Sequence, residues 1–264
     1  MYDFTYHKAG SLDEAAKLLK GADDGVFLAG GQTLIPTLKQ RLAAPSDVVD
    51  VGAIGDLQGI SVDGGVVTIG AAVTHAEVAG SEEVRGAIAA LADLAGEIGD
   101  PHVRHRGTLG GSVANNDPAA DYPAACVGLG ATIETTSGSY AAVDFFTGMF
   151  ETALSEGEII TRISFPVPKR AAYAKFANPA SRYALVGVFV ADTGDSVRVA
   201  VTGAGPGVFR VSDMEAALAK DFSARAIAGI AVSGDDLNSD IHADSDYRAH
   251  LVGVMARRAV EAAG

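Results

Sequence analysis

The fold of this chain is decided by two glycine-rich segments, Ala29-Gly30-Gly31-Gln32-Thr33 and Thr108-Leu109-Gly110-Gly111-Ser112. Each follows an apolar, strand-like run and combines consecutive backbone N–H groups with hydroxyl side chains. Glycine has no Cβ and tolerates a positive φ, so the main chain in such a segment can approach phosphate oxygens closely. Two such segments could close on one pyrophosphate, which predicts a dinucleotide held without a Rossmann helix. Ordinary tight turns of an α/β protein are the alternative.

The composition is that of a globular protein with a full core. Of the 264 residues, 48% are hydrophobic and 20% are charged, enough for one large folded unit or two to three small ones. No apolar stretch approaches the ~20 residues of a membrane span, and residues 1–14 include acids but no apolar signal core. We therefore expect a cytoplasmic protein without a membrane span.

Cysteine content and charge restrict the possible partners. With a single cysteine, Cys126, the chain cannot form an internal disulfide, a zinc cage or an iron–sulfur cluster, so any such centre must belong to another chain. The net charge of −13 repels nucleic acid and anionic membranes, so we expect neither as a partner. A phosphate-bearing ligand would need local donors, and the basic run His102, Arg104, His105 and Arg106 lies just before the second glycine segment.

Periodicity and capping signals predict mixed helices and strands in the first part of the chain. Ser11-Leu12-Asp13-Glu14 has the form of a capping box and begins a helix that Gly21 ends. Thr74-His75-Ala76-Glu77 has the same form. Apolar residues at steps of three and four make 83–96 the clearest predicted helix. Further expected elements are strands at 26–29, 48–51, 66–73 and 158–165, a hairpin at 131–140, and helices at 35–42 and 118–129; the first two strands form a small βαβ-like unit.

Pro166 and Pro168, followed by Lys169-Arg170, form the best candidate domain boundary. This boundary gives a first domain over 1–168, with subdomains of about 1–55 and 56–168, and a second over 169–264. Strands expected at 173–177, 184–191 and 197–201 have the spacing of a meander, and helices are expected at 213–219, 223–230 and 247–262. The second domain is therefore predicted to be α+β with an antiparallel sheet.

Two further features have simple interpretations. The pair His102-x-x-His105 lacks a nearby third ligand, so no metal is assigned. Cys126 lies in an apolar stretch and is interpreted as a packed core thiol rather than a nucleophile or the attachment point of a covalently bound cofactor.

The order of the motifs along the chain resembles a known family. The motifs are Gly30-Gly31-Gln32-Thr33, the run from Arg106 to Ser112, the run from Asp117 to Pro123, and Gly157-Glu158-Ile159-Ile160. Over nearly its whole length the chain resembles the medium, FAD-binding subunit of molybdenum hydroxylases, the group that includes carbon monoxide dehydrogenase and xanthine dehydrogenase. The resemblance implies an α+β fold: a two-part FAD-binding domain of the vanillyl-alcohol oxidase type, followed by a C-terminal α+β domain.

The resemblance also implies a set of contacts to non-covalently bound FAD. Asp121 would reach a hydroxyl or amine at the adenosine end, although its position alone favours a helix-surface carboxylate. Ile98, Ile160 and Lys175 match further contact positions, and Tyr183 could shield a face of the isoalloxazine ring. The residues that would wrap the pyrophosphate and ribityl chain are Leu28, Ala29, Gly30, Gly31, Gln32, Thr33, Leu34, Thr108, Leu109, Gly110, Gly111 and Ser112. Valine at Gly31 or Gly110 is then expected to abolish FAD retention with smaller effects on folding.

The implied function is electron transfer within a hetero-oligomer. FAD would take electrons from a small iron–sulfur subunit and pass them to an external acceptor, while a large subunit would hold the molybdenum cofactor. No catalytic residue is assigned in this chain. Two alternatives stay open from the residues alone: a stand-alone flavin-dependent reductase or oxidase, and a flavin-free scaffold subunit in which the glycine turns are only structural.

Overall fold

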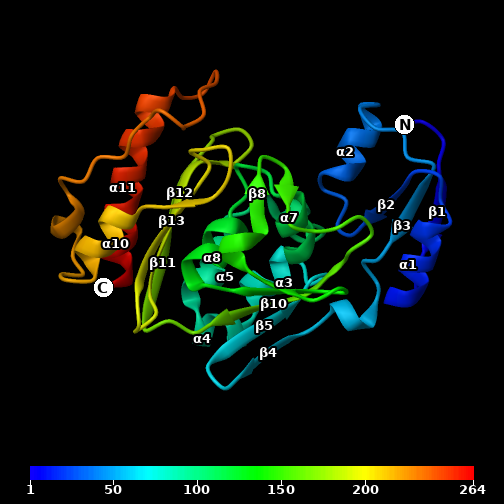
Figure 1. The fold of residues 1–264 in the computed structure, drawn as a ribbon, viewed down its shortest axis with the longest axis horizontal. Helices are drawn as coiled ribbons and strands as arrows, with labels where there is room; N and C mark the ends of the chain where they lie inside the picture. Colours follow the sequence, from blue (N-terminus) through cyan, green and yellow to red (C-terminus); the bar gives the residue numbers. More distant parts are fainter.

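The computed structural model of the protein describes residues 1–264 and arranges them in three groups of elements along its longest axis (Figure 1). The first group is a parallel sheet in which β3 lies between β1 and β2. The predicted βαβ-like unit is present, and β1 is a strand that sequence reasoning missed. The elements of this group are β1 (Thr5–Lys8), α1 (Leu12–Lys20), β2 (Gly25–Leu28), α2 (Leu34–Lys39) and β3 (Asp47–Asp50).

The first helix begins and ends where the sequence predicts. The Ser11 hydroxyl accepts a hydrogen bond from the backbone N–H of Glu14 at 3.2 Å. The Glu14 carboxylate in turn accepts one from the backbone N–H of Gly10 at 2.7 Å. Gly21 ends α1, with its N–H donating to carbonyls of the last turn. The capping signals therefore fix α1 locally, before tertiary packing contributes.

The second group contains an antiparallel sheet in the order β4-β5-β10-β6-β7, packed against short helices. The predicted hairpin at 131–140 and the strand ending near Phe165 are confirmed. The elements are η1 (Gly55–Leu57), β4 (Ile60–Asp63), β5 (Val66–Gly70), α3 (His75–Gly80), α4 (Glu82–Ala87), α5 (Ala89–Gly96), α6 (Pro101–Arg104), α7 (Leu109–Asn115), α8 (Tyr122–Leu129), β6 (Thr132–Thr135), β7 (Ser139–Ala141), α9 (Ala142–Phe145), β8 (Phe146–Gly148), β9 (Glu151–Thr152) and β10 (Ile160–Pro166).

The structure corrects the prediction of one helix over 83–96. The chain leaves the helical conformation at Ile88, where φ is −139° and ψ is 77°, so α4 and α5 are separate helices. Gly86 lies in the last turn of α4 and weakens it. Val84 and Ile88 are both buried, although they do not lie on one continuous helix.

The predicted helix over 118–129 is also shorter than expected and begins at Tyr122. Residues 117–120 form a turn instead, in which the Asp117 carboxylate accepts a hydrogen bond from the N–H of Ala119. The carbonyls of Pro118 and Ala120 accept hydrogen bonds from the Thr202 hydroxyl, which lies on β13. Tertiary hydrogen bonds have therefore replaced the first turn of the helix.

The third group is an antiparallel sheet with two helices on one face. Its strand order is β11-β12-β13-β14, as the meander spacing predicts, but the stretch 223–230 contains only the 3-10 helix η2. No helix of the chain combines the length and the apolar character needed to cross a membrane. The elements are β11 (Arg170–Ala177), β12 (Ala184–Asp192), β13 (Val197–Thr202), β14 (Phe209–Arg210), α10 (Ser212–Leu218), η2 (Ala224–Ile227) and α11 (Ser245–Ala263).

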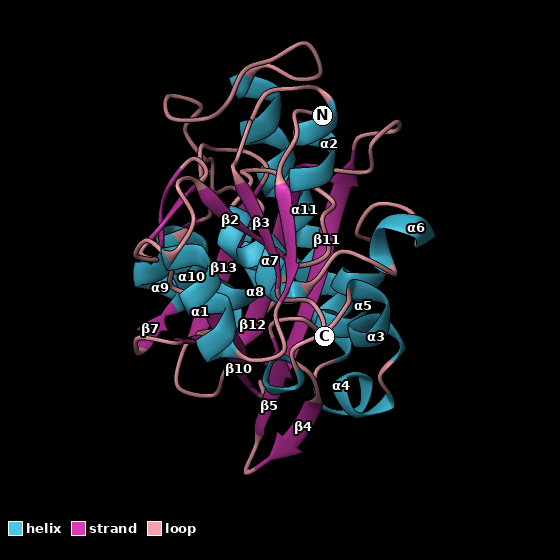
Figure 2. Ribbon diagram, turned by 90° about the vertical axis from the view of Figure 1, so that its right-hand side faces the viewer, coloured by secondary structure: helices cyan, strands magenta, loops and turns pink.

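The strand β12 joins the second and third groups because both of its faces are buried. Successive side chains of a strand point to opposite faces, and here the faces belong to different hydrophobic clusters. Phe189 and Ala191 pack in the larger cluster with α8, whereas Val188 and Val190 pack in the smaller cluster with α11. Figures 1 and 2 show the sheet between these helices. The division at residue 168 stays a prediction, since the larger cluster includes residues from both sides of it.

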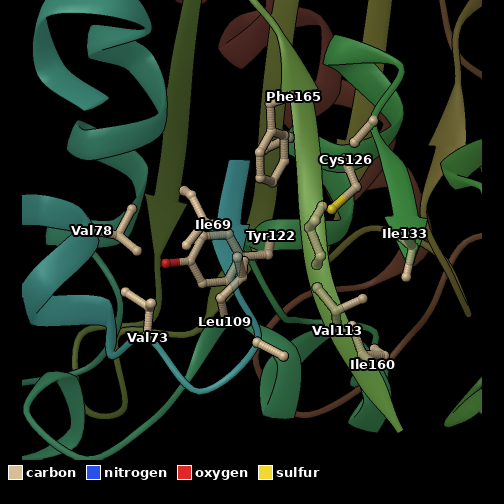
Figure 3. Packing of buried hydrophobic residues seen from close by; sticks show 14 of the residues in the cluster. Ile69, Val73, Val78, Leu109, Val113, Tyr122, Cys126, Ile133, Ile160 and Phe165 are labelled. Carbon is tan, nitrogen blue, oxygen red and sulfur yellow. The ribbon is translucent and has the colours of Figure 1, made fainter. Parts of the chain in front are cut away.

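The larger cluster also contains the helix that follows the second glycine segment. Figure 3 shows Tyr122 and Leu109 packed with Ile69 of β5. Cys126 is fully buried among them, and burial raises the pKa of its thiol, so the interpretation as a packed core thiol is confirmed. Gly110 begins this packing: a Cβ there would lie 2.5 Å from the Cβ of Ala71 and 2.8 Å from its carbonyl oxygen.

Replacing Gly110 with alanine should therefore destabilise the fold, which corrects the expectation that a side chain at this position has smaller effects on folding than on FAD retention. The added methyl would overlap the Ala71 backbone, and overpacking of this kind costs about 1 to 3 kcal/mol. Gly86 provides a matched control, because it is also helical but a Cβ there meets nothing within 4 Å. Gly86→Ala should leave stability unchanged or raise it by up to about 1 kcal/mol. Denaturant unfolding of both variants measures the difference, and equal stability of Gly110→Ala and wild type would contradict the prediction.

Candidate functional site: a cavity between the two glycine segments

A cavity of about 590 Å³ lies where the first and second groups of elements meet. This volume falls in the range of small-molecule and cofactor sites. Of the FAD-contact residues that the resemblance implies, the cavity brings together all except Leu109, which is fully buried, and Lys175. The sequence-selected residues in its lining are Leu28, Ala29, Gly30, Gly31, Gln32, Thr33, Leu34, Ile98, Thr108, Gly110, Gly111, Ser112, Asp121, Ile160 and Tyr183.

The backbone of the first glycine segment approaches the backbone of the two residues that directly precede the second segment. A Cβ on Gly30 would lie 2.1 Å from the carbonyl oxygen of Arg106 and 2.7 Å from the Cα of Gly107. Gly31 has a φ of +71°, a left-handed conformation that side chains other than glycine rarely adopt. Glycine is therefore required at both positions by the contact and the conformation, before any ligand is considered.

The first segment lines the cavity and has a run of backbone N–H groups without a partner in the protein. None of the N–H groups from Gly30 to Leu34 donates a hydrogen bond within the protein. The Gln32 side chain donates to the carbonyl of Gly30, and the Thr33 hydroxyl makes no capping bond to α2. Successive free N–H groups next to a positive-φ residue form a site for an anion. The prediction of consecutive donors is confirmed for this segment.

For the second segment, the prediction of free N–H groups is wrong. The segment is the first turn of α7 rather than a loop after a strand. The N–H of Leu109 donates to Val73 and that of Gly110 to Ala71, at 3.0 and 2.8 Å. The N–H groups of Gly111 and Ser112 both donate to Thr108, at 3.1 and 3.0 Å. Of its five N–H groups, only that of Thr108 has no acceptor within the protein, so this segment contributes close approach and the Ser112 hydroxyl rather than a run of backbone donors.

The basic run before the second segment does not line the cavity. Arg104 donates instead to the carbonyls of Ile98 and Gly99, beyond the end of α5. No lysine or arginine is among the lining residues, and the ionisable ones besides His75 and Tyr183 are the acids Asp117, Asp121 and Glu158. An anion in this cavity would therefore be held by dipoles and not by charged side chains.

Asp121 forms a buried ion pair at the edge of the cavity. Lys175 is 1% exposed, and its Nζ lies 2.9 Å from one Asp121 oxygen and 3.1 Å from the other. The same ammonium donates to the carbonyl of Glu97, and the Tyr173 hydroxyl donates to Asp121 at 2.6 Å. Burial raises the pKa of Asp121, while Lys175 and Tyr173 oppose that shift. Lys175 thus acts on the cavity through Asp121.

Tyr183 stands between this cavity and a second one of about 290 Å³. Its side chain is 53% exposed and lines both cavities. The turn that carries it is closed by hydrogen bonds between Asn178 and Tyr183 and between Arg182 and Asn178, with Arg182 at a φ of +62°. Partial burial raises the pKa of the Tyr183 phenol, so the side chain is neutral at physiological pH.

Sequence reasoning missed His75, which also lines the cavity. It appeared only as the second residue of a capping box, and the structure confirms that box around Thr74 and Glu77. The His75 ring is 4% exposed, and its Nδ1 has no hydrogen-bond partner. Burial, with a smaller effect of Arg104, lowers the pKa of His75 from 6.5 to about 4. The only sequence signal that could have indicated this position is that His75 directly follows the N-cap residue Thr74.

Comparison with known proteins identifies the family. Residues 2–168 match the family described as the FAD binding domain in molybdopterin dehydrogenase. The chain belongs to this family. It is 36% identical to the nicotine 6-hydroxylase medium subunit of Paenarthrobacter nicotinovorans, over 98% of this chain and 96% of that one. It is 34% identical to the carbon monoxide dehydrogenase medium chain of Afipia carboxidovorans, with the same coverage.

Solved structures agree with this assignment. A chain of the carbon monoxide dehydrogenase from Oligotropha carboxidovorans superposes with a TM-score of 0.89 at 34% identity, covering 99% of this chain and 97% of that one. The resemblance to the medium subunits of molybdenum hydroxylases is therefore confirmed, and with it the α+β fold and the FAD cofactor. The chain is an oxidoreductase subunit.

In this FAD-binding family member, replacing Lys175 with methionine should destabilise the fold. Removing one partner of a buried ion pair costs about 3 to 5 kcal/mol, because the remaining charge has no counter-ion. Without Lys175, the folded protein would hold a proton on Asp121 that the unfolded chain releases, so the stability of the variant should fall as the pH rises from 5 to 8. Denaturant unfolding at both pH values measures this. The double variant Asp121→Asn/Lys175→Met should lose less, and a larger loss would contradict the prediction.

The buried His75 predicts a loss of stability in acid. Its pKa is 6.5 in the unfolded chain and about 4 in the folded protein, so the unfolded chain binds an extra proton between these values. Stability should therefore fall as the pH drops from 6.5 to 4, with up to about 3 kcal/mol from this group. Unfolding of wild type and His75→Phe at pH 7 and pH 4.5 isolates the contribution. An equal acid effect in both proteins would show that His75 is not responsible.

Proposed function

We propose that the cavity holds FAD non-covalently and that the chain is the electron-transferring subunit of a molybdenum hydroxylase complex. The observation that carries the proposal is the run of unpaired N–H groups from Gly30 to Leu34 at a cavity of cofactor size. Because the lining has no lysine or arginine, these dipoles are the donors available to a pyrophosphate. The Thr33 and Ser112 hydroxyl groups add donors on the two sides.

The site assignment combines residues of three kinds. The first segment, Leu28 to Leu34, would bind the pyrophosphate through its N–H groups. The second, Thr108 to Ser112, would allow close approach, with Leu109 supporting it from the core. Asp121 would lie beside the adenosine end, and Lys175 would position Asp121 rather than touch the cofactor. Ile98 and Ile160 would add apolar contact, and Tyr183 would cover a face of the isoalloxazine ring.

When bound, FAD supplies the ability to accept electrons singly and to pass them on in pairs. The chain contributes a dry, shaped site and donors at the phosphates. The relatives are named as medium subunits or medium chains, which supports a complex with a small iron–sulfur subunit and a large molybdenum-cofactor subunit. With only Cys126, itself buried, this chain offers no cluster ligands of its own. Domains over 1–168 and 169–264 and a cytoplasmic location are part of the same proposal.

The first test is a visible spectrum of the purified chain with and without added FAD. A two-band flavin spectrum that releases FAD on extraction supports the proposal, and a chain that takes up no FAD contradicts it.

The placement of the pyrophosphate is tested by Thr33→Asp. Aspartate is a favourable N-cap for α2, so stability should be unchanged or higher. A carboxylate beside the free N–H groups should weaken FAD binding by at least about tenfold, because two charges about 4 Å apart repel by about 1 kcal/mol in water and about 4 kcal/mol near a protein surface. Ser137→Asp, in the exposed β6–β7 turn, adds the same charge as a control. Titration of FAD measures both, and equal affinities would overturn the placement.

A further inference from the structure

We propose that His75 is a cofactor-binding residue, whose Nε2–H group donates a hydrogen bond to an oxygen of FAD at the junction of the two glycine segments. The inference rests on the proposed function, in which this cavity holds FAD. It adds a residue from α3 to a site otherwise built from the two glycine segments. It is argued from the position of the ring, the state of its two nitrogen atoms and the lack of charged donors around it.

The position of the His75 ring is fixed on both sides. Its backbone N–H donates to the carbonyl of Gly107 at 3.0 Å, and the capping box of Thr74 and Glu77 holds the start of α3. A Cβ on Gly107 would lie 2.6 Å from Nε2, so the ring lies directly against this glycine. Gly107 is in turn in contact with Gly30. The imidazole therefore lies beside the point where the two segments meet.

The two nitrogen atoms of the ring are in different surroundings. Nδ1 is fully buried and has no hydrogen-bond partner, whereas Nε2 is not among the buried, unpartnered atoms. Buried N–H groups without an acceptor are rarer in proteins than acceptors without a donor. A neutral imidazole carries one proton, so it belongs on Nε2 and Nδ1 keeps a lone pair. Nε2–H is then the polar group that His75 presents at the cavity.

The imidazole stays neutral over the working range of pH. Burial lowers its pKa to about 4, and the positive charge of Arg104, on α6, acts in the same direction. Tyr122, on α8, packs against it with ring centroids 5.4 Å apart, and burial raises the pKa of its phenol well above the usual value, so it is also neutral. His75 is therefore a hydrogen-bond donor whose state does not change between pH 6 and pH 8.

Such a donor fits the electrostatics of the cavity. The lining contains three carboxylates and no lysine or arginine, so FAD oxygens depend on uncharged donors. The free N–H groups of the first segment supply these on one side. In the second segment, the four N–H groups from Leu109 to Ser112 all donate within the protein, so only the N–H group of Thr108 is without a protein acceptor on that side. His75 supplies a donor on that second side.

Three substitutions separate the donor from the ring. In His75→Gln, the side-chain amide places an N–H near the former Nε2 position. His75→Asn places its amide near Nδ1 instead, and His75→Phe keeps the ring without polar atoms. FAD affinity, measured by titration with the full chain, should fall about tenfold in His75→Phe and His75→Asn, as expected for one hydrogen bond of about 1 to 1.5 kcal/mol. His75→Gln should stay within about threefold of wild type, which is the scale of context effects on one such bond.

A second readout does not depend on affinity. Nitrogen-15 spectra of histidine-labelled protein distinguish the two neutral tautomers, and the His75 signals are assigned by their loss in His75→Gln. The proposal expects the proton on Nε2 at pH 7 and a shift of the Nε2 signal when FAD is added. Thermal unfolding checks that each variant is folded; His75→Phe removes an unpartnered buried nitrogen and should be at least as stable as wild type.

The outcomes are distinct. Loss of affinity in the phenylalanine and asparagine variants with retention in the glutamine variant, together with an Nε2–H tautomer, supports the proposal. Wild-type affinity in His75→Phe, equal loss in all three variants, or a proton on Nδ1 would each overturn it. If the wild-type chain binds no FAD, the proposed function itself fails, which is a separate result.

Discussion

The structure depends on one steric constraint, the contact between the backbones of Gly30 and Arg106–Gly107. A side chain at Gly30 would occupy the space of Arg106 and Gly107, directly before the second segment, so the two groups of elements could not approach as they do. The cavity lies beside this contact, and the His75 ring lies against Gly107 at the same place. The glycines of both segments therefore serve first to let neighbouring backbone segments pack closely, as Gly30 does against Arg106–Gly107 and Gly110 against Ala71. Space for a ligand is a second consequence.

Local signals in the sequence predicted the parts of the fold that local interactions determine. The capping boxes at Ser11 and Thr74, the left-handed Gly130 after α8 and the β6–β7 hairpin all appear as expected. The errors occur where distant contacts compete. The turn before Tyr122 replaces a helical turn because Thr202 donates to its carbonyls, and the predicted helix over 83–96 is broken at Ile88, whose side chain is buried.

The candidate site shows the same division. The glycine segments were recognisable, but the sequence could not reveal that the N–H groups of Leu109 and Gly110 are already used, since their acceptors in Val73 and Ala71 lie far back in the chain. It also could not reveal that Arg104 is absent from the cavity lining and donates to the carbonyls of Ile98 and Gly99 instead. An acidic protein with no cation in the cavity wall must bind an anion through fixed dipoles, which do not depend on pH and are screened little by salt when they are buried.

The buried pair of Asp121 and Lys175 affects how this protein can be divided or recombined. The family match ends at residue 168, yet the counter-ion of a carboxylate at the cavity edge comes from residue 175, on β11. A fragment that stops at the match would leave that carboxylate without a partner. A chimera that exchanges the C-terminal sheet between relatives would have to keep Asp121, Tyr173 and Lys175 together. The ion pair therefore extends beyond the part of the chain that the family match covers.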